Sequence, residues 1–288
     1  MAKRVLTGTR RRFPVANDIF YPDSRETLAS QLASWDLKTA GNFSSRGGQV
    51  IIAPHGAWDI SGSIAGAAFA SVQGNDVQPD YVPVNGIRRV ILLGPCHGCN
   101  EEGIYLSESD IFQTPLGNLP VDRKLNRELA SCSTLIRVND IPHLSEHSLE
   151  VLLPLVKYCF PDVRIIPILA NGGRPALISG LARALRVTLE NCMEDSLLVI
   201  SSNVSRNMEP ALALSMAEEF RSVLLSMDTG VFLASLAGGR ISACGAALIA
   251  ALLESGLLDG KRCSALTPLI NSIEEDGQTI YYGAFAAG

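Results

Sequence analysis

The sequence predicts a single α/β domain in which helices cover both faces of a mainly parallel or mixed β-sheet. Short apolar runs typical of buried strands alternate with helical patterns from one end of the chain to the other. Hydrophobic residues make up 47% of the 288 residues and charged residues only 18%, which is enough apolar material for a large core. We find no linker, low-complexity tract or internal repeat, so we expect residues 1–288 to form one domain.

Near-continuous runs of valine, isoleucine and leucine predict the strands, because a strand covered by helices on both faces has no polar side. The predicted strands span residues 49–53, 88–93, 164–169, 197–201 and 279–285, and residues 102–106 resemble another strand. The predicted helices span residues 25–35, 61–72, 122–131, 146–160, 175–191, 210–226, 230–237 and 244–254. Asp23 and Glu26 suggest a capping box for the first of these helices, and Pro154 predicts a kink or break within residues 146–160.

Composition and charge exclude several classes of protein. The net charge of −5 gives no electrostatic reason to expect a nucleic-acid partner, and we expect the basic cluster Arg10–Arg12 to be a solvated surface or an arm that packs on the domain. The longest apolar stretch, residues 244–253, is about half of the roughly 20 residues that a bilayer requires, so it predicts a buried helix and no membrane span. Seven scattered cysteines, an odd number, favour reduced thiols in a cytoplasmic protein.

Two of the four histidines follow predicted strands directly. His55 comes after Ile-Ala-Pro, and His97 comes after Leu-Gly-Pro-Cys. Ligands of open α/β sheets bind at the carboxyl ends of the strands, so both imidazoles are expected at that edge. A lone histidine there is more often structural, but two in matching contexts make a metal site and a structural role about equally plausible.

A third ligand would have to come from another part of the chain. Cys244 lies at the predicted start of a helix, where the helix N-terminus stabilises the thiolate that binds metal. The alternative is that Cys244 is a small buried hydrophobic residue in an alanine-rich helix. His147, flanked by Glu146, is a candidate acid–base group, whereas His143 is expected to be solvated or to lie at a helix entry.

Cys96 and Cys99 form a C-x-x-C pair, which permits a thiol–disulfide redox function. Redox-active pairs of this kind begin at a helix N-terminus, and here a strand is expected to follow, so this hypothesis ranks below metal binding. The sequence contains no phosphate-binding glycine loop, H-E-x-x-H motif or G-x-S-x-G elbow, so a nucleotide enzyme of standard type is not expected.

Several segments, taken together and in order, resemble the Memo family. They include residues 12–16, 20–22, 53–55, 61–62, 93–97, 114–122 (T-P-L-G-N-L-P-V-D), 146–150 (E-H-S-L-E) and 244–245. The resemblance implies a fold like the catalytic subunit of class III extradiol dioxygenases. It also implies a metal pocket formed by His55, His97 and Cys244, with iron or copper favoured and zinc as an alternative. Prokaryotic members are grouped as protein B of the AmmeMemoRadiSam system, which implies AMMECR-type and radical-SAM proteins as partners.

The chain departs from the family pattern around this pocket. Asn203 and Arg206 replace an aspartate and a histidine, and Gly98 and Leu152 replace two further histidines. Removing an acid–base group typically lowers a rate by about 10²- to 10⁴-fold, so metal binding is the firmer expectation. Our first hypothesis is a redox or oxygen-dependent metalloprotein acting on a small molecule, with His147 as the proton-transfer group. Asn203 and Arg206 would then orient an anionic ligand. The alternative is a non-catalytic binding or scaffold protein that kept the fold.

Overall fold

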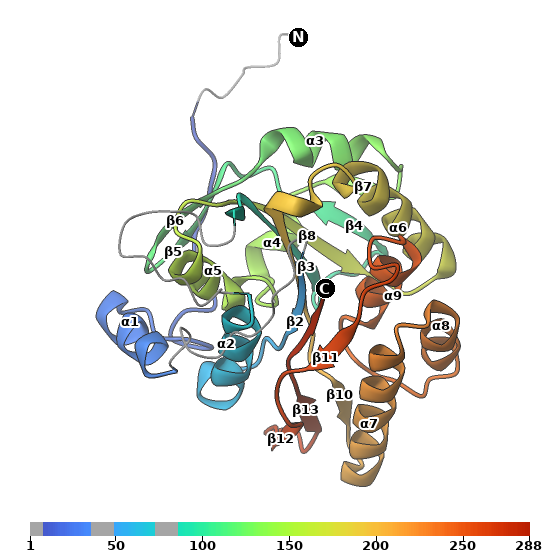
Figure 1. Ribbon diagram of the computed structural model, residues 1–288. Coiled ribbons are helices and arrows are strands. Elements are labelled where there is room, and N and C mark those ends of the chain that lie inside the picture. Colours follow the sequence, from blue (N-terminus) through green and yellow to red (C-terminus); the bar gives the residue numbers. More distant parts are fainter. Residues whose placement is uncertain (1–7, 36–48, 73–85) are drawn as a thin grey trace.

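A mixed eight-stranded sheet forms the centre of the computed structural model, which describes residues 8–35, 49–72 and 86–288 (Figure 1). The strand order is β11-β14-β2-β9-β3-β8-β4-β7. These strands are β2 (Gln49–Ala53), β3 (Arg89–Pro95), β4 (Gly103–Leu106), β7 (Ile136–Val138), β8 (Arg164–Asn171), β9 (Ser196–Ser201), β11 (Cys263–Ala265) and β14 (Phe285–Ala287). The central strands β2, β9, β3 and β8 are parallel, and β14 and β11 extend one edge in antiparallel pairing. The predicted mainly parallel or mixed sheet is confirmed.

Helices cover both faces of this sheet (Figure 1). One face packs against α1 (Arg25–Ser34), α2 (Ser63–Ala70) and α5 (Leu153–Cys159); the other packs against α3 (Arg123–Ser131), α6 (Pro175–Leu189), α7 (Pro210–Ser226), α8 (Thr229–Ala237) and α9 (Ala246–Glu254). Along β3, Ile91 and Leu93 enter one apolar core, whereas Val90 and Leu92 enter the other. This double burial explains why the four residues Val90–Leu93 are all apolar.

Two small sheets flank the large one. The first contains β1 (Arg11–Arg12), β5 (Ile111–Thr114) and β6 (Gly117–Pro120); the second contains β10 (Ser205–Asn207), β13 (Thr279–Tyr282) and β12 (Ile270–Ile273). The single strand predicted over residues 279–285 is therefore wrong. The chain leaves the second small sheet at Gly283 and joins the large sheet as β14. A Cβ at Gly283 would lie 3.0 Å from a methyl group of Leu269, so a glycine suits this crossing.

Several helix boundaries differ from the prediction for local reasons. Residues 146–149 are not helical, and only a 3₁₀ turn (Glu150–Leu152) precedes α5. The polar groups of Ser148 form other hydrogen bonds: its N–H donates to the Glu146 carboxylate, and its Oγ donates to the carbonyl of Pro95 at the end of β3. Pro154 lies in the first turn of α5, where its missing N–H is harmless, and it does not kink a longer helix. A π-helical turn (Trp58–Gly62) similarly precedes α2.

The N-terminal caps also differ from the expectation. Ser24, and not Asp23, caps α1, since its Oγ accepts the N–H of Thr27 at 3.3 Å. At the other end of the chain, α9 begins at Ala246 with Gly245 as its cap residue, so Cys244 lies in the preceding loop and not inside a helix.

Both expectations for the basic cluster apply to parts of it: Arg10 and Arg11 are exposed, whereas Arg12 packs against the domain. The Arg12 side chain is 2% exposed and forms an ion pair with Glu150, which is 1% exposed. The Glu150 carboxylate also accepts hydrogen bonds from the backbone N–H groups of Val15 and Ala16 and from the hydroxyl of Tyr21. The segment before α1 is therefore fixed against the interior by one buried carboxylate.

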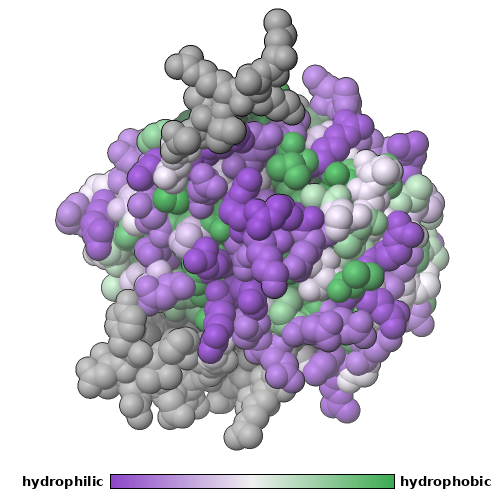
Figure 2. Space-filling model, turned by 90° about the horizontal axis from the view of Figure 1, so that it is seen from above, coloured by the Kyte–Doolittle hydropathy of each residue, from purple (hydrophilic) through white to green (hydrophobic). Residues whose placement is uncertain are grey.

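No helix in the described ranges 8–35, 49–72 and 86–288 combines the length and apolarity needed to span a membrane. On the face of the molecule seen in Figure 2, hydrophilic residues predominate among those described, and hydrophobic residues form small separate groups between them.

Candidate metal centre

The two expected histidines flank the end of the same central strand. His55 follows β2, His97 follows β3, and β9 lies between these two strands. Since the three strands are parallel, their carboxyl ends lie at one rim, which brings the two ring centroids to 5.2 Å. Asn203, just beyond β9, accepts the backbone N–H of His55 with its side-chain oxygen at 3.2 Å.

Cys244 reaches the same rim from the loop between α8 and α9. The next residue, Gly245, donates its N–H to Ser202 Oγ at 2.9 Å. A Cβ at Gly245 would lie 2.9 Å from the carbonyl oxygen of Ser201, so only glycine allows this close approach. The Sγ of Cys244 then lies 3.5 Å from Nε2 of His55.

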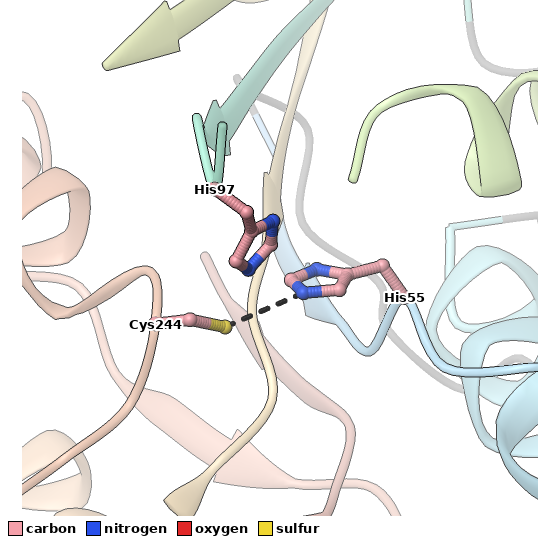
Figure 3. Close-up of side chains that lie close together, drawn as sticks. All are labelled: His55, His97 and Cys244. Atoms are coloured by element: carbon pink, nitrogen blue, oxygen red, sulfur yellow. Dashed lines mark hydrogen bonds between the residues drawn. The ribbon is translucent and has the colours of Figure 1, made fainter. Parts of the chain in front are cut away.

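His55, His97 and Cys244 form a group that could hold a metal ion, and they point toward one another from three separate elements (Figure 3). One ligand atom of each residue lies within 4.8 Å of the others. His55 is buried, whereas Cys244 is partly exposed and His97 exposed, so the group opens toward solvent on one side.

Hydrogen bonds orient both imidazoles. The hydroxyl of Ser201 donates its hydrogen to the carbonyl of Ser148 at 2.6 Å, so Oγ accepts a hydrogen bond from Nδ1–H of His55 at 2.7 Å. Nδ1 of His97 likewise donates to a Glu146 carboxylate oxygen at 2.9 Å. Both assignments leave Nε2 of each ring as the atom that faces the cluster, and a metal that binds there displaces the proton from Nε2.

The thiol of Cys244 is held as a thiolate. Burial alone would raise its pKa, but the electrostatic interaction with His55, hydrogen bonds with both imidazoles and the N–H of Asn203 outweigh burial and lower the pKa to about 5. The N–H of Asn203 donates to Sγ at 3.0 Å. The sulfur is therefore in the form that ligates metals at neutral pH.

Glu146 and His97 stabilise each other's charges. Burial opposes ionisation of both groups, but their hydrogen bond and charge attraction lower the pKa of Glu146 and raise the pKa of His97, the latter helped by Cys244. Glu146 also accepts the backbone N–H groups of His97 and Ser148. A negative charge thus lies directly behind the imidazole of His97, where it strengthens that ring as a ligand.

A titration of the metal-free protein tests this description of Cys244. We expect thiolate ultraviolet absorbance at pH 7 that disappears as the pH falls, with a midpoint about 5. The sign follows from the lowered pKa: the thiolate is present above it and protonated below it. Burial raises the pKa of Cys159 and of Cys263 to about 12, so neither contributes at pH 7. Loss of the absorbance in Cys244→Ser would assign it to the Cys244 thiolate, and absorbance that persists in this variant would contradict that assignment.

Comparison with known proteins assigns the chain to a family. The model of the family described as Memo-like protein matches residues 11–271. The chain belongs to this Memo-like family. A MEMO1 family protein from Aeropyrum pernix is 30% identical over 291 residues, covering 96% of this chain and 98% of that protein. Another from Desulfurococcus amylolyticus is 26% identical over 258 residues, covering 85% and 87% of the two chains.

A solved structure supports the fold of this Memo-like chain. The crystal structure of uncharacterized protein JW3007 from Escherichia coli K12 aligns with a TM-score of 0.52 and 15% sequence identity. The alignment covers 84% of this chain and 100% of the other. This likeness concerns the fold alone.

His147 lies next to the His/Cys group of the Memo-like chain. Its ring stacks on His97 with centroids 4.9 Å apart and on Phe20 with centroids 4.4 Å apart. Burial, with the charges of His55 and His97, lowers the pKa of His147 to about 4, so its ring is neutral at pH 7. His147, His97 and Glu146 make a second group whose ligand atoms could hold a metal.

Two other predicted residues lie away from this rim. The guanidinium of Arg206 bonds Gln278 and Asp276 of the β12–β13 hairpin, so the structure directs this side chain to the hairpin, and its role toward an anionic ligand stays a prediction. His143 is not solvated, but it does lie near the start of a helix, the short α4 (Ile141–Ser145). Its side chain is 2% exposed, its Nε2 hydrogen-bonds to the carbonyl of Tyr105, and burial lowers its pKa to about 4.

The residues that orient the imidazoles were not predicted for this role. The sequence alone places Glu146 beside His147, Ser148 in the E-H-S-L-E segment and Ser201 at the end of a predicted strand. Ser201 did carry a local signal, because it is a polar residue that ends an otherwise apolar strand. The partners of Glu146 and Ser148 are 49 and 53 residues away, which no local pattern encodes.

Proposed function

We propose that this Memo-like protein binds one transition metal ion through Nε2 of His55, Nε2 of His97 and Sγ of Cys244, and that it supports redox or oxygen-dependent chemistry on a small molecule. One observation carries the proposal. Nδ1 of each imidazole is occupied by a hydrogen-bond partner and the sulfur is a thiolate, so the two Nε2 atoms and Sγ are the ligand atoms that lie together, and a metal would displace the proton from Nε2.

The three donor atoms limit which metal ions can bind. Two imidazole nitrogens and a thiolate suit iron, copper and zinc and do not suit Mg²⁺ or Ca²⁺, which prefer oxygen ligands. Iron or copper would supply one-electron chemistry and an open position for dioxygen or substrate beside three protein ligands. The relation to class III extradiol dioxygenases that the sequence motifs imply is consistent with iron and oxygen.

The surrounding residues would perform the protein's part of the reaction. His147, neutral at pH 7 and stacked on His97, is placed to accept a proton from a ligand at the open side of the group. Glu146 would orient the His97 ring through the hydrogen bond from Nδ1 and strengthen Nε2 as a ligand. Asn203 fixes the backbone of His55 through its side chain and the thiolate through its N–H.

Anaerobic titration of the protein with Fe(II), Cu(I) and Zn(II), followed by gel filtration and elemental analysis, tests the proposal. We expect one equivalent of metal to be retained, and we expect Fe(II) or Cu(I) protein to consume oxygen when aromatic small molecules are screened. Retention of less than a tenth of an equivalent of every metal would overturn the site. Full retention without oxygen consumption would favour the non-catalytic scaffold function.

A further inference from the structure

The ligand His97 lies between two bonded cysteines. Cys96 and Cys99 form a disulfide with Cα atoms 5.5 Å apart, so the expectation that all seven cysteines are reduced is wrong for this pair. The other five cysteines are free: Cys132, Cys159, Cys192, Cys244 and Cys263. The one disulfide therefore encloses a residue of the candidate metal centre.

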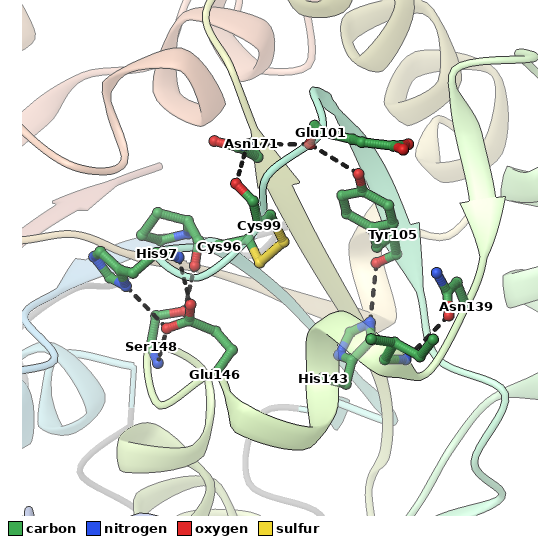
Figure 4. The surroundings of a disulfide bond; sticks show 12 residues. Cys96, His97, Cys99, Glu101, Tyr105, Asn139, His143, Glu146, Ser148 and Asn171 are labelled. Carbon is green, nitrogen blue, oxygen red and sulfur yellow. Dashed lines mark hydrogen bonds and ion pairs between the residues drawn. A yellow bond between two sulfur atoms is a disulfide. The ribbon is translucent and has the colours of Figure 1, made fainter.

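The backbone on either side of the disulfide is anchored to the sheet (Figure 4). The N–H of Cys96 donates to the carbonyl of Ala170 at 2.9 Å. The side-chain amide of Asn171 donates to the carbonyls of Cys99 and Glu101, at 2.8 and 3.0 Å. The residues between these anchors, His97 and Gly98, are exposed, so the S–S bond is the covalent restraint on the segment that carries the ligand.

A purely structural role explains this disulfide poorly. The two cysteines are three positions apart, and a closed loop this short restrains the unfolded chain least. A structural framework would also be expected to use more of the five remaining thiols. In a reducing compartment, the disulfides that do form are usually catalytic or redox-sensing.

The two sulfurs differ in access. Cys96 is 6% exposed and belongs to one of the two apolar cores, whereas Cys99 is partly exposed and packs against that core. An incoming thiolate therefore reaches Cys99 first, and the sulfur of Cys96 is the leaving group. This asymmetry is the feature that a directional exchange reaction requires.

We propose that Cys96 and Cys99 are a redox-active pair that exchanges with a dithiol reductant and thereby controls how firmly His97 is held for metal binding. The control of metal binding rests on the proposed function; the exchange itself does not. A thiolate of the reductant attacks Cys99, forming a mixed disulfide and releasing the Cys96 thiolate. The second thiol of the reductant then attacks the mixed disulfide and releases Cys99. The protein gains two electrons and two protons, and the reductant becomes a disulfide.

Reduction opens the ring around His97 but leaves its hydrogen bond to Glu146. The imidazole must then be ordered at the moment of metal binding, whereas in the disulfide form this ordering has already occurred. The disulfide form is accordingly the tighter metal-binding state. Loss of an orienting contact at a metal ligand typically lowers affinity by about 10- to 100-fold, and we expect the lower end of that range.

Equilibration with mixtures of reduced and oxidised dithiothreitol, followed by alkylation and peptide mass spectrometry, tests the exchange. We expect Cys96 and Cys99 to be alkylated together, reversibly, with the circular dichroism of the folded protein retained. Cys132→Ser, which removes a partly exposed free thiol, is the matched control and should exchange in the same way. Reduction that occurs only on unfolding would overturn the proposal.

The effect on metal is measured by anaerobic zinc titration after the dithiothreitol has been removed by gel filtration. We expect the disulfide form to bind zinc roughly tenfold more tightly than the reduced form. Cys96→Ser/Cys99→Ser should match the reduced form and lose all dependence on redox treatment. Equal or tighter binding by the reduced protein would overturn the control of metal binding. Binding of zinc in neither form would overturn the proposed function, while the alkylation result would still decide the exchange.

Discussion

Replacing Cys244 by serine is expected to weaken metal binding by more than about 100-fold, beyond the range that follows loss of an outer hydrogen-bond partner. The Cys244 sulfur is already ionised near neutral pH, because its pKa is lowered to about 5. A serine hydroxyl in its place stays protonated and offers a poor donor for a borderline or soft metal. The substitution keeps nearly the same shape, so the fold should survive.

Zinc titration with a competing chelator measures this change. Cys263→Ser is the matched control, since it removes a free thiol whose pKa burial raises to about 12 and which lies on the edge strand β11. Its zinc affinity should equal that of the unmodified protein. A Cys244→Ser protein that binds zinc within threefold of this control would show that the sulfur is not a ligand.

The largest effect on stability is expected at Arg12. The Arg12→Met substitution leaves the Glu150 carboxylate buried without its positive partner, and such changes cost about 3–5 kcal/mol. Arg12 also donates to the carbonyls of His143 and Glu146, which would lose their partner. The free energy of unfolding, measured by urea denaturation at pH 7, should fall accordingly.

Arg11→Met is the matched control for this experiment. Arg11 is the adjacent residue of the same short strand but is exposed, and substitutions at such positions usually change stability by within about 0.5 kcal/mol. If the two variants unfolded at the same urea concentration, the buried ion pair would contribute nothing to stability.

The central strands could be predicted because their signal is local. Residues 49–53 and 197–201 are apolar at nearly every position, and the structure has strands β2 and β9 there. The rim position of His55 and His97 followed from the same signal, since both come just after a buried strand. What the sequence left open was which strands are neighbours, and the placement of β9 between β2 and β3 decides how close the two rings lie.

The parts that could not be predicted depend on contacts between distant residues. The local sequence around Arg12 does not show whether its side chain is solvated or packed. Its buried position depends on Glu150, which is 138 residues away in the sequence. The residues next to Cys244 in the sequence are consistent both with a buried helical residue and with a metal ligand. The contact that distinguishes the two is the close approach of Gly245 to Ser202, which is distant in the sequence. The break between β13 and β14 arises because the first part of this segment pairs with β10 in a small sheet and the second part pairs with β2 in the large sheet.

Glu150 links the start of the chain to the environment of His147 without touching that histidine. Its carboxylate holds the N–H groups of Val15 and Ala16, and a few residues later Phe20 lies flat on the His147 ring. Phe20 thus forms an aromatic wall beside the candidate metal centre. A change at Glu150 would shift that wall, so the stability of the fold and the surroundings of His147 cannot be engineered independently in this protein.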